Sequence, residues 1–297
     1  MSSPHKVSDE PDSPDSSDLN MNSAERVEPI RLLVSDIDGT LVRDDKTLPT
    51  ANREAILGLR AAGVPTTLIS ARPPSGMAGL AAKLDLAGPM AAFNGGTLFD
   101  PDGSIRVAYR LGEADAAWVL QLVGRAGVTP WIFGLGAWFV PALDNSHLAR
   151  ERLASGIDPI MRSDFAGLLD RVDKIVAVSD DHGLLGQLEE QARETIGARA
   201  TIARSQAHYL DFTHRRANKG DGIGALAAAF GVDLAQIAAI GDMANDVAMF
   251  ARAGLAVAMG QSPAEVCAAA DFTAAANEQA GVADAITRFI RPRIGRH

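Results

Sequence analysis

Two carboxylates, Asp36 and Asp38, are separated by one residue and followed directly by Gly39. In an extended chain, side chains two residues apart point the same way, and a glycine lets the backbone turn sharply behind them. Repulsion between neighbouring carboxylates raises the pKa of one of them, so one acid can stay ionised and attack while the other donates a proton. This pairing suits a reaction in which one carboxylate attacks the substrate and the other gives a proton to the oxygen that leaves. The alternative is a strand that ends in an ordinary Asp-Gly turn.

A second pair of acids, Asp242 and Asp246, is four residues apart in the sequence, with Asn245 between them. If all four acids met beside Lys219 and Arg72, the site would be too negative to admit a phosphate unless a divalent cation also entered. A set of oxygen ligands favours Mg²⁺. The alternative is that Asp246 only caps the helix that follows it.

Two single residues add donors that a phosphate requires. Ser70 follows a short apolar run, and Lys219 precedes a helical pattern. Each has an ordinary explanation by itself, because a serine in this place often caps a helix and a lysine there is usually solvated. A hydroxyl and an ammonium, combined with backbone N–H groups at helix starts, form a set that binds phosphate.

The elements that would position these residues alternate between short apolar strands and helical patterns. Strands are predicted at 30–35, 65–69, 90–93, 237–240 and 255–259. Such alternation indicates a doubly wound α/β fold, a parallel sheet with helices on both faces. Ligands bind such sheets in the crevice at the carboxyl ends of the strands. Four of the predicted strands end close to a polar residue there: Asp36, Ser70, Asn94 and Asp242.

The pattern changes between residues 97 and 207. Apolar runs at 97–99 and 105–109, joined by an Asp-Pro-Asp-Gly turn, indicate a hairpin, which a parallel sheet does not use. Further elements are predicted as helices at 113–126 and 184–195 and as strands at 131–133, 138–140, 174–178 and 209–212. We expect a catalytic core of residues 29–96 and 208–297, interrupted by an α+β cap domain of residues 97–207.

The amino-acid composition excludes several other classes of protein. The 297 residues carry a net charge of −9, so they offer no basic surface to nucleic acid or to an anionic membrane. The single cysteine, Cys267, allows no internal disulfide and suits a reducing cytoplasm. Apolar stretches are too short to span a bilayer. We expect a soluble cytoplasmic protein, monomeric or homodimeric, that binds neither nucleic acid nor membranes.

The first 28 residues differ from the rest of the chain. Seven acidic residues stand there against Lys6 and Arg26, and no aromatic residue is present. Such a composition predicts a disordered acidic leader, because too little apolar surface is available to offset the entropy of ordering. The segment also has no apolar run of the kind that a signal peptide requires.

A set of short motifs resembles a known family. The sequence is similar to the haloacid dehalogenase (HAD) superfamily of phosphatases, and closely to the Cof-type hydrolases with a C2 type of cap. The motifs follow the family order over nearly everything after residue 29: Asp36-Ile37-Asp38-Gly39-Thr40-Leu41, Ile69-Ser70-Ala71-Arg72, Asn94-Gly95-Gly96, Asn218-Lys219-Gly220, Gly241-Asp242-Met243-Ala244-Asn245-Asp246, Ala256-Val257-Ala258-Met259-Gly260 and Asn277-Glu278-Gln279-Ala280-Gly281-Val282-Ala283.

The resemblance implies a role for each matched residue. Asp36 would be the nucleophile and Asp38 the acid/base. Mg²⁺ would be bound by Asp36, the Asp38 backbone carbonyl and Asp242, with Asp246 supporting Lys219 or the metal shell. The residues that bind phosphate would be Ser70, Ala71, Arg72, Lys219 and Asn245. The sequence departs from the family at two positions: Gln261 stands where Asn is usual, and Ser70 where Thr is frequent.

These observations predict a Mg²⁺-dependent phosphomonoesterase that acts on a small phosphorylated metabolite, such as a sugar or polyol phosphate. Alternatives on the same fold are a phosphotransferase, a phosphomutase or a non-catalytic phosphate-binding regulator. A hypothesis from a different class is a nucleotide-binding oxidoreductase, since the glycines at Gly222 and Gly224 fit a dinucleotide fingerprint. Because Lys219 separates these glycines from the preceding strand, we favour close packing of a helix as their role.

Aromatic residues concentrate in the predicted cap. We interpret Trp131, Phe133, Trp138 and Phe139 as cap core, with a place in the substrate site as the alternative. The histidines in and near the cap have no metal-binding spacing: His147, His182, His208 and His214.

Overall fold

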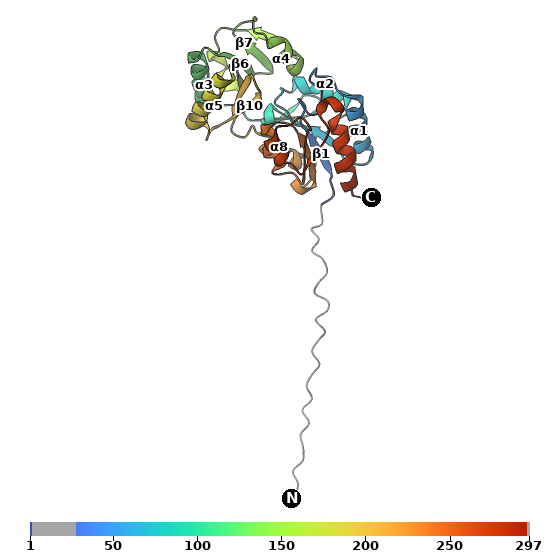
Figure 1. Cartoon of the computed structure of the whole chain (residues 1–297). Helices are drawn as coiled ribbons and strands as arrows, with labels where there is room; N and C mark the ends of the chain where they lie inside the picture. The colour runs from blue at the N-terminus through green and yellow to red at the C-terminus, as the bar shows by residue number, and fades with distance from the viewer. Residues whose placement is uncertain (2–27, 296–297) are drawn as a thin grey trace.

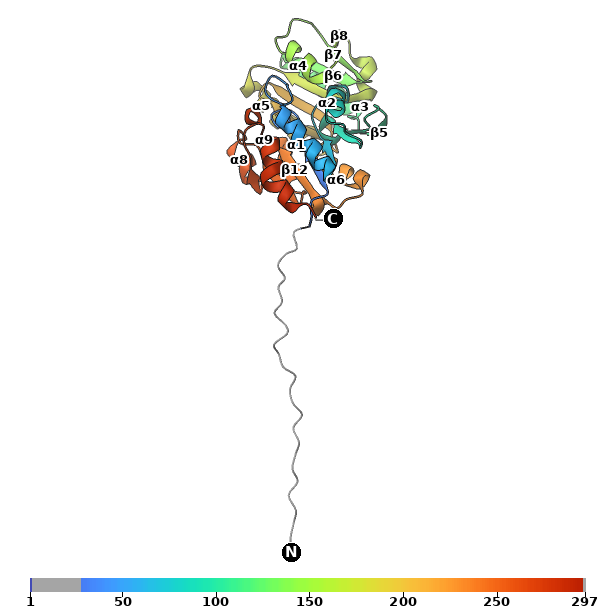
Figure 2. The same ribbon diagram turned by 90° about the vertical axis from the view of Figure 1, so that its right-hand side faces the viewer.

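The computed structural model describes Met1 and residues 28–295. The predicted acidic leader therefore lies outside the described residues, except at its two ends. Figures 1 and 2 show two lobes. One lobe contains a five-stranded sheet and the other a six-stranded sheet.

The five-stranded sheet is parallel throughout and has the order β14-β13-β12-β1-β2. Its strands are β1 (Leu32–Ser35), β2 (Thr66–Leu68), β12 (Ile237–Gly241), β13 (Leu255–Ala258) and β14 (Phe272–Thr273). Alternate residues of β1 enter two different apolar clusters, Leu33 on one face and Leu32 with Val34 on the other. Burial on both faces explains why these strands read as unbroken apolar runs.

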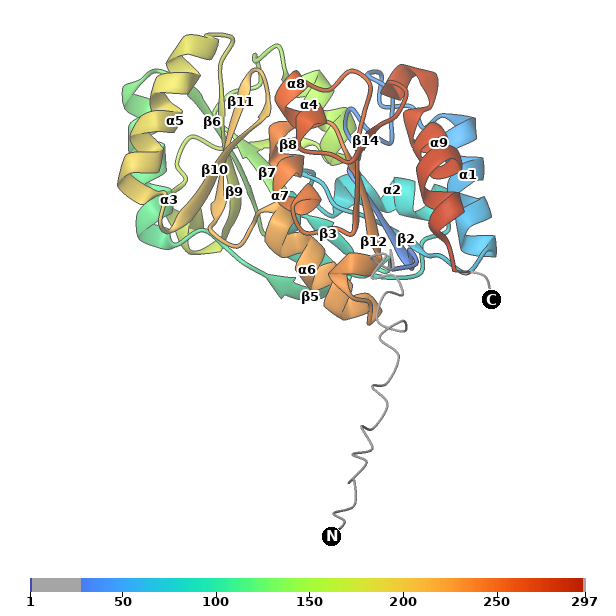
Figure 3. The ribbon, with the colours of Figure 1, turned by 60° about the horizontal axis from the view of Figure 1, so that its bottom comes forward.

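Helices cover both faces of this sheet, so the predicted doubly wound fold is confirmed (Figure 3). One face carries α1 (Thr50–Ala61), α2 (Ser75–Lys83) and α9 (Gly281–Ala285). The other carries α6 (Lys219–Phe230), α7 (Val247–Phe250) and α8 (Ala264–Ala268). Helix α6 begins where the Asn218 side chain accepts a hydrogen bond from the Asp221 N–H at 2.8 Å, and ends at Gly231 in the left-handed conformation.

A small antiparallel sheet lies beside β2. It consists of β3 (Met90–Ala92), β4 (Thr97–Phe99) and β5 (Ile105–Ala108). The predicted hairpin is confirmed, but β3 is not a full member of the parallel sheet, because it pairs with the chain after β2 through a single isolated bridge, between Ile69 and Ala91. The pairing partner of a short apolar run is set by tertiary contacts that the run itself does not encode.

The six-stranded sheet has the order β10-β11-β9-β6-β7-β8. Its strands are β6 (Thr129–Gly134), β7 (Ala137–Val140), β8 (Pro159–Met161), β9 (Val172–Val178), β10 (Ala200–Gln206) and β11 (Tyr209–His214). Helices α3 (Glu113–Arg125) and α5 (His182–Ile196) pack on one face, while α4 (Leu148–Ser155) lies between β7 and β8 in the sequence.

The second face of this sheet is turned toward the lobe that contains the five-stranded parallel sheet, called the catalytic lobe because it holds the predicted catalytic core. Trp131 and Val176 belong to the apolar cluster of that lobe, whereas their neighbours Ile132 and Ile175 pack under α3 and α5. The alternation of side chains along β9 also places Lys174 on the second face, where it is buried. Polar side chains on this face of the sheet can therefore reach the catalytic lobe.

Strand pairing favours boundaries for the second unit other than the expected 97–207. Strand β11 runs to His214 inside the six-stranded sheet, and β4 and β5 pair with β3 instead. The two connections between the units lie side by side, since the rings of Tyr109 and His214 stack with centroids 5.4 Å apart. We propose a division near residues 110 and 215. Among the residues that the structure describes, no helix has both the length and the apolar composition for a membrane span.

Candidate active site

Asp36 directly follows β1, the strand that lies between β12 and β2 in the parallel sheet. Its backbone N–H donates to the Ile240 carbonyl at 2.9 Å, which aligns the ends of β1 and β12. Asp242 follows β12 directly, and Lys219 is the first residue of α6. Parallel pairing thus brings together residues that are about 200 positions apart in the sequence, as expected for a site at a sheet edge.

Lys219 lies among buried carboxylates. Its Nζ is 2.7 Å from Asp36 Oδ1 and 2.6 Å from Asp246 Oδ1, and only 1% of the residue is exposed. Oxygens of Asp36, Asp242 and Asp246 lie within 4.8 Å of one another. One ammonium facing three carboxylates leaves an excess of negative charge that a divalent cation would neutralise.

Burial and this excess of negative charge raise the pKa values of two of these acids. Burial raises the pKa of Asp36 to about 7 despite the opposing charge of Lys219, and the negative charge of Asp246 adds to the rise. Burial, together with Asp36 and Asp246, raises the pKa of Asp242 to about 8. Burial is the main cause of both shifts, and Lys219 offsets it only in part, so this donor set fits a hard cation bound by oxygen, such as Mg²⁺.

Asp246 and Thr40 hold the cluster in place. One oxygen of Asp246 accepts hydrogen bonds from the backbone N–H groups of Asp242 and Met243, both at 2.9 Å, while the other meets Lys219. Thr40 Oγ1 donates to Asp242 Oδ1 at 2.8 Å. Because both oxygens of Asp246 are used within the chain, we propose that it positions Lys219 and the turn after β12 rather than binding the metal directly.

Asp38 has a different environment. Arg72 donates to both of its oxygens, at 2.7 and 2.8 Å, and Lys46 Nζ donates to Oδ1 at 2.6 Å. Burial opposes ionisation, but Arg72 and then Lys46 outweigh it and hold the pKa of Asp38 well below its usual range. The predicted repulsion from Asp38 contributes to the raised pKa of Asp36, but burial contributes most, and the two cations decide the ionisation of Asp38.

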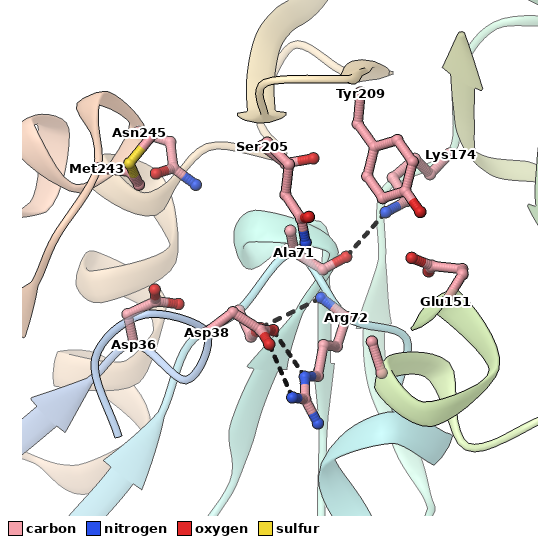
Figure 4. Close-up of a pocket in the computed structure, with 13 residues that line it drawn as sticks. Asp36, Asp38, Ala71, Arg72, Glu151, Lys174, Ser205, Tyr209, Met243 and Asn245 are labelled. Carbon is pink, nitrogen blue, oxygen red and sulfur yellow. Dashed lines mark hydrogen bonds and ion pairs between the residues drawn. The ribbon is translucent and has the colours of Figure 1, made fainter. Parts of the chain in front are cut away.

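The other predicted phosphate-binding residues line one pocket with Asp36 and Asp38 (Figure 4). Ser70 is buried, and its Oγ accepts a hydrogen bond from the Arg72 N–H at 3.2 Å. The Ala71 carbonyl accepts from Lys174 Nζ at 3.1 Å, so the six-stranded sheet contacts the catalytic lobe here. Asn245 Nδ2 donates to Asn94 Oδ1 at 3.2 Å, and its own Oδ1 is buried without a partner among the described residues.

The pocket also contains residues that the sequence motifs did not include. Glu151 comes from α4, Lys174 from β9 and Tyr209 from β11, and all three face the catalytic acids across the pocket (Figure 4). The four aromatic residues predicted as cap core are buried, and none of them lines this pocket in the described part of the chain. A charged residue inside an apolar strand, as Lys174 is in β9, was the available signal.

Two further sequence features have structural explanations. Gly222 lies inside α6, where a Cβ atom would come within 2.6 Å of Ile69 Cδ1 and 2.9 Å of Gly95 Cα. Close helix packing therefore explains the glycines, as we favoured over the dinucleotide fingerprint. Gln261, at the position that departs from the family, donates to the Gly39 carbonyl at 2.6 Å and accepts from the Asn277 N–H at 3.0 Å.

Comparison with known proteins decides the family. The model of the haloacid dehalogenase-like hydrolase family matches residues 33–286. The chain belongs to this family. This confirms the predicted enzyme class and the Cof-type HAD phosphatase assignment.

Individual relatives of this HAD hydrolase cover nearly its whole length. The 5-amino-6-(5-phospho-D-ribitylamino)uracil phosphatase of Bacillus subtilis is 26% identical, over 88% of this chain and 98% of that protein. The HMP-PP phosphatase of Cronobacter sakazakii is 28% identical, over 80% of this chain and 87% of that protein. The crystal structure of a haloacid dehalogenase-like hydrolase from Bacteroides thetaiotaomicron has a TM-score of 0.77 at 25% identity, with 87% and 99% of the two chains covered.

A prediction for the HAD hydrolase concerns Gly39, which has a φ of +77°. A Cβ atom there would lie 2.3 Å from Asp242 Oδ2, so Gly39→Ala must displace this carboxylate. We expect the Mg²⁺ concentration for half-maximal activity to rise by about 10–100-fold, as measured by titration of activity with Mg²⁺. Gly103→Ala is the matched control, because Gly103 has a φ of +88° with nothing within 4 Å. An equal effect of both variants would contradict this explanation.

A second prediction concerns Lys219→Met, which keeps the volume of the side chain and removes its charge. In the role that the family resemblance implies, the ammonium would bind the phosphoryl group, which all the esters share, so hydrolysis of every phosphate ester should slow by about 10²–10³-fold with little change in the order of preference among esters. Mg²⁺ should bind more tightly, since the carboxylates lose their only close cation among the described residues. Kinetics on several esters and Mg²⁺ titration test both effects, with Lys83→Met on the exposed side of α2 as control. A changed order of preference among the esters, together with an unchanged dependence on Mg²⁺, would contradict this prediction.

Proposed function

We propose that this chain is a Mg²⁺-dependent phosphomonoesterase that hydrolyses a small phosphorylated metabolite through an aspartyl phosphate on Asp36. One observation carries the proposal: the Asp36 carboxylate ends a buried strand beside Lys219 and Asp242, and Asp38 lines the same pocket. A nucleophile, a charge-stabilising ammonium, a metal-binding carboxylate and an acid/base are the groups that phosphate-ester hydrolysis requires.

In the first step, an Asp36 oxygen attacks phosphorus in line, and the ester oxygen leaves with a proton from Asp38. Water that Asp38 deprotonates then attacks the same phosphorus, which releases phosphate and restores Asp36. Lys219 would stabilise the charge on the equatorial oxygens. When bound by Asp36, the Asp38 backbone carbonyl and Asp242, Mg²⁺ supplies further positive charge to those oxygens.

The acid step requires a proton on Asp38, whose pKa is held low by Arg72 and Lys46. An incoming phosphoryl group is itself an anion, and it competes with Asp38 for the Arg72 guanidinium. Loss of that ion pair would return the pKa of Asp38 toward its usual value, because Arg72 makes the strongest contribution to lowering it. This exchange gives Arg72 the role in phosphate binding that the motif implies.

We propose a sugar or polyol phosphate as the substrate class. The relative from Bacillus subtilis is named for a substrate with a phosphorylated ribityl chain, which is a polyol phosphate. The pocket of this chain is lined by polar side chains beyond the catalytic acids, among them Ser205 and Gln206. Such groups suit an alcohol that carries several hydroxyls.

The test is a phosphate-release screen over sugar, polyol and nucleotide monophosphates, with Mg²⁺ or with EDTA. We expect release from at least one sugar or polyol phosphate that stops in EDTA and returns with Mg²⁺. The same reactions run with an added alcohol acceptor detect transfer of the phosphoryl group to the alcohol, which would identify a phosphotransferase instead. Release that persists in EDTA would reject the Mg²⁺-dependent mechanism.

A further inference from the structure

Glu151 is a buried carboxylate in the pocket, and the mechanism does not use it. Only 7% of the residue is exposed, and it lines the pocket opposite Asp36 and Asp38. Figure 4 shows its carboxylate on the same side of the pocket as the Tyr209 hydroxyl and the Lys174 ammonium. Burying a charged carboxylate costs free energy unless a cation or a hydrogen-bond donor compensates it.

The cations near Glu151 are engaged elsewhere. Lys174 donates to the Ala71 carbonyl at 3.1 Å and lies 3.6 Å from Asp211, while Arg72 holds Asp38. No ion pair within 4.0 Å joins Glu151 to a cation in residues 28–295. Burial raises the pKa of Glu151 to about 7, and the charge of Lys174 offsets this only in part.

A second polar group lies beside Glu151. The Tyr209 hydroxyl is buried and has no hydrogen bond of normal geometry to the described residues, although burial and then the negative charge of the nearby Glu151 raise the pKa of this hydroxyl. Protein interiors rarely leave such groups unpaired, and those that are unpaired call for an explanation. An acceptor and a hydroxyl that both face a substrate pocket are explained if substrate groups complete their hydrogen bonds.

The helix that carries Glu151 is fixed at both ends. At its C-terminal end, the Ser155 carbonyl accepts a hydrogen bond from Ser75 Oγ at 2.7 Å, which joins α4 to α2. At its N-terminal end, His147 Nε2 lies 2.8 Å from Asp180 Oδ1. Glu151 is therefore held in place before a substrate arrives, as a residue that determines specificity should be.

We propose that Glu151 accepts a hydrogen bond from a hydroxyl on the alcohol part of the phosphate ester, and that this enzyme selects polyhydroxylated alcohols without a second anionic group. The inference rests on the proposed phosphatase function and refines its substrate class. A carboxylate or second phosphate on the alcohol would meet the negative charge of Glu151, while Lys174, the cation beside it in the pocket, is already held by the Ala71 carbonyl and by Asp211.

Two matched pairs of esters test the inference. Sorbitol 6-phosphate and 6-phosphogluconate differ at the terminal carbon, which is a hydroxymethyl in the first and a carboxylate in the second. Glucose 6-phosphate and glucosamine 6-phosphate differ by an ammonium that replaces one hydroxyl. p-Nitrophenyl phosphate carries no further hydroxyl that Glu151 could bind, so its kcat/KM serves as the reference for phosphate transfer itself. All are assayed with the full chain and Mg²⁺.

The unaltered chain should prefer sorbitol 6-phosphate to 6-phosphogluconate by at least about tenfold in kcat/KM. Glu151→Gln keeps the shape and removes the charge, so it should shrink this preference several-fold. Glu151→Ala should lower the ratio of kcat/KM for sorbitol 6-phosphate to that for p-nitrophenyl phosphate by about 10–200-fold. Glu194→Gln, on the exposed side of α5, is the control and should change neither ratio. Thermal melts establish that each variant is folded.

The outcomes separate the two proposals. If no ester in the panel is hydrolysed, the proposed function itself fails. If p-nitrophenyl phosphate is hydrolysed and the ratios do not change in folded Glu151→Gln and Glu151→Ala, the role of Glu151 is overturned. A preference for glucosamine 6-phosphate over glucose 6-phosphate that Glu151→Gln abolishes would overturn the hydroxyl assignment in favour of an ammonium.

Discussion

Asp36→Asn is expected to reduce kcat by roughly 10⁵–10⁶-fold, the scale of loss when a covalent nucleophile is removed. The amide cannot form the aspartyl phosphate, and no other described carboxylate occupies the end of β1. Folding should be unaffected, because the change removes one of three buried carboxylates that face a single ammonium. The measurement is the rate of phosphate release with the best ester of the screen, together with a thermal melt.

Asp45→Asn is the matched control, since Asp45 lies in the same loop region but is exposed and bonds only to Thr47. It should retain the activity of the unaltered chain. Trace activity in an Asp36→Asn preparation can come from deamidation of the new side chain, so the variant is also assayed immediately after purification. A folded Asp36→Asn variant within tenfold of the unaltered rate would show that Asp36 is not the nucleophile.

Much of the catalytic lobe could be predicted from the sequence, because burial on both faces leaves a strong local signal. Strands β1, β12 and β13 were expected within two residues of their observed bounds. The helical pattern expected at Lys219 is α6. Motifs at strand ends then converge by topology alone, since all five strands are parallel. The meeting of Asp36, Lys219 and Asp242 follows from that rule.

The six-stranded sheet was harder to predict. The short edge strand β8, the strand β10 and the helix α4 were not anticipated, although α4 carries Glu151. Edge strands and short helices have weak patterns, because fewer of their residues enter the core. What the face of the sheet that carries Lys174 contacts also depends on how the two units pack, and no local pattern in β9 encodes that packing.

Protonation states were the least predictable part of the site. Repulsion between Asp36 and Asp38 is a correct local argument, but the cations that settle the charge of Asp38 come from elsewhere in the chain. Lys46 lies in the loop after the motif, and Arg72 follows the next strand; their ion pairs with Asp38 form only in the folded chain. The pKa of a buried group depends on the whole set of neighbours within a few ångströms, and a sequence motif gives only some of them.

Asp38→Asn is expected to slow hydrolysis of alkyl phosphates, such as sugar phosphates, by about 10²–10⁴-fold, because their alkoxide leaving groups need a proton. p-Nitrophenolate is a stable leaving group, so the first step with p-nitrophenyl phosphate should be affected much less. The second step still requires a base to activate water, and Asp38 is the group assigned to it. The variant should therefore form the aspartyl phosphate from the aryl ester and hydrolyse it slowly.

Rapid mixing of the variant with p-nitrophenyl phosphate makes this difference visible. Asp38→Asn should release close to one equivalent of p-nitrophenol per enzyme in a burst, followed by slow turnover, and acid quenching should recover phosphate bound to protein. Arg72 loses the charged partner that it contacts at 2.7 Å, so a thermal melt is needed to establish that the variant is folded. Equal losses in the first step for alkyl and aryl esters, without a burst, would mean that Asp38 positions Arg72 and Lys46 and does not transfer the proton.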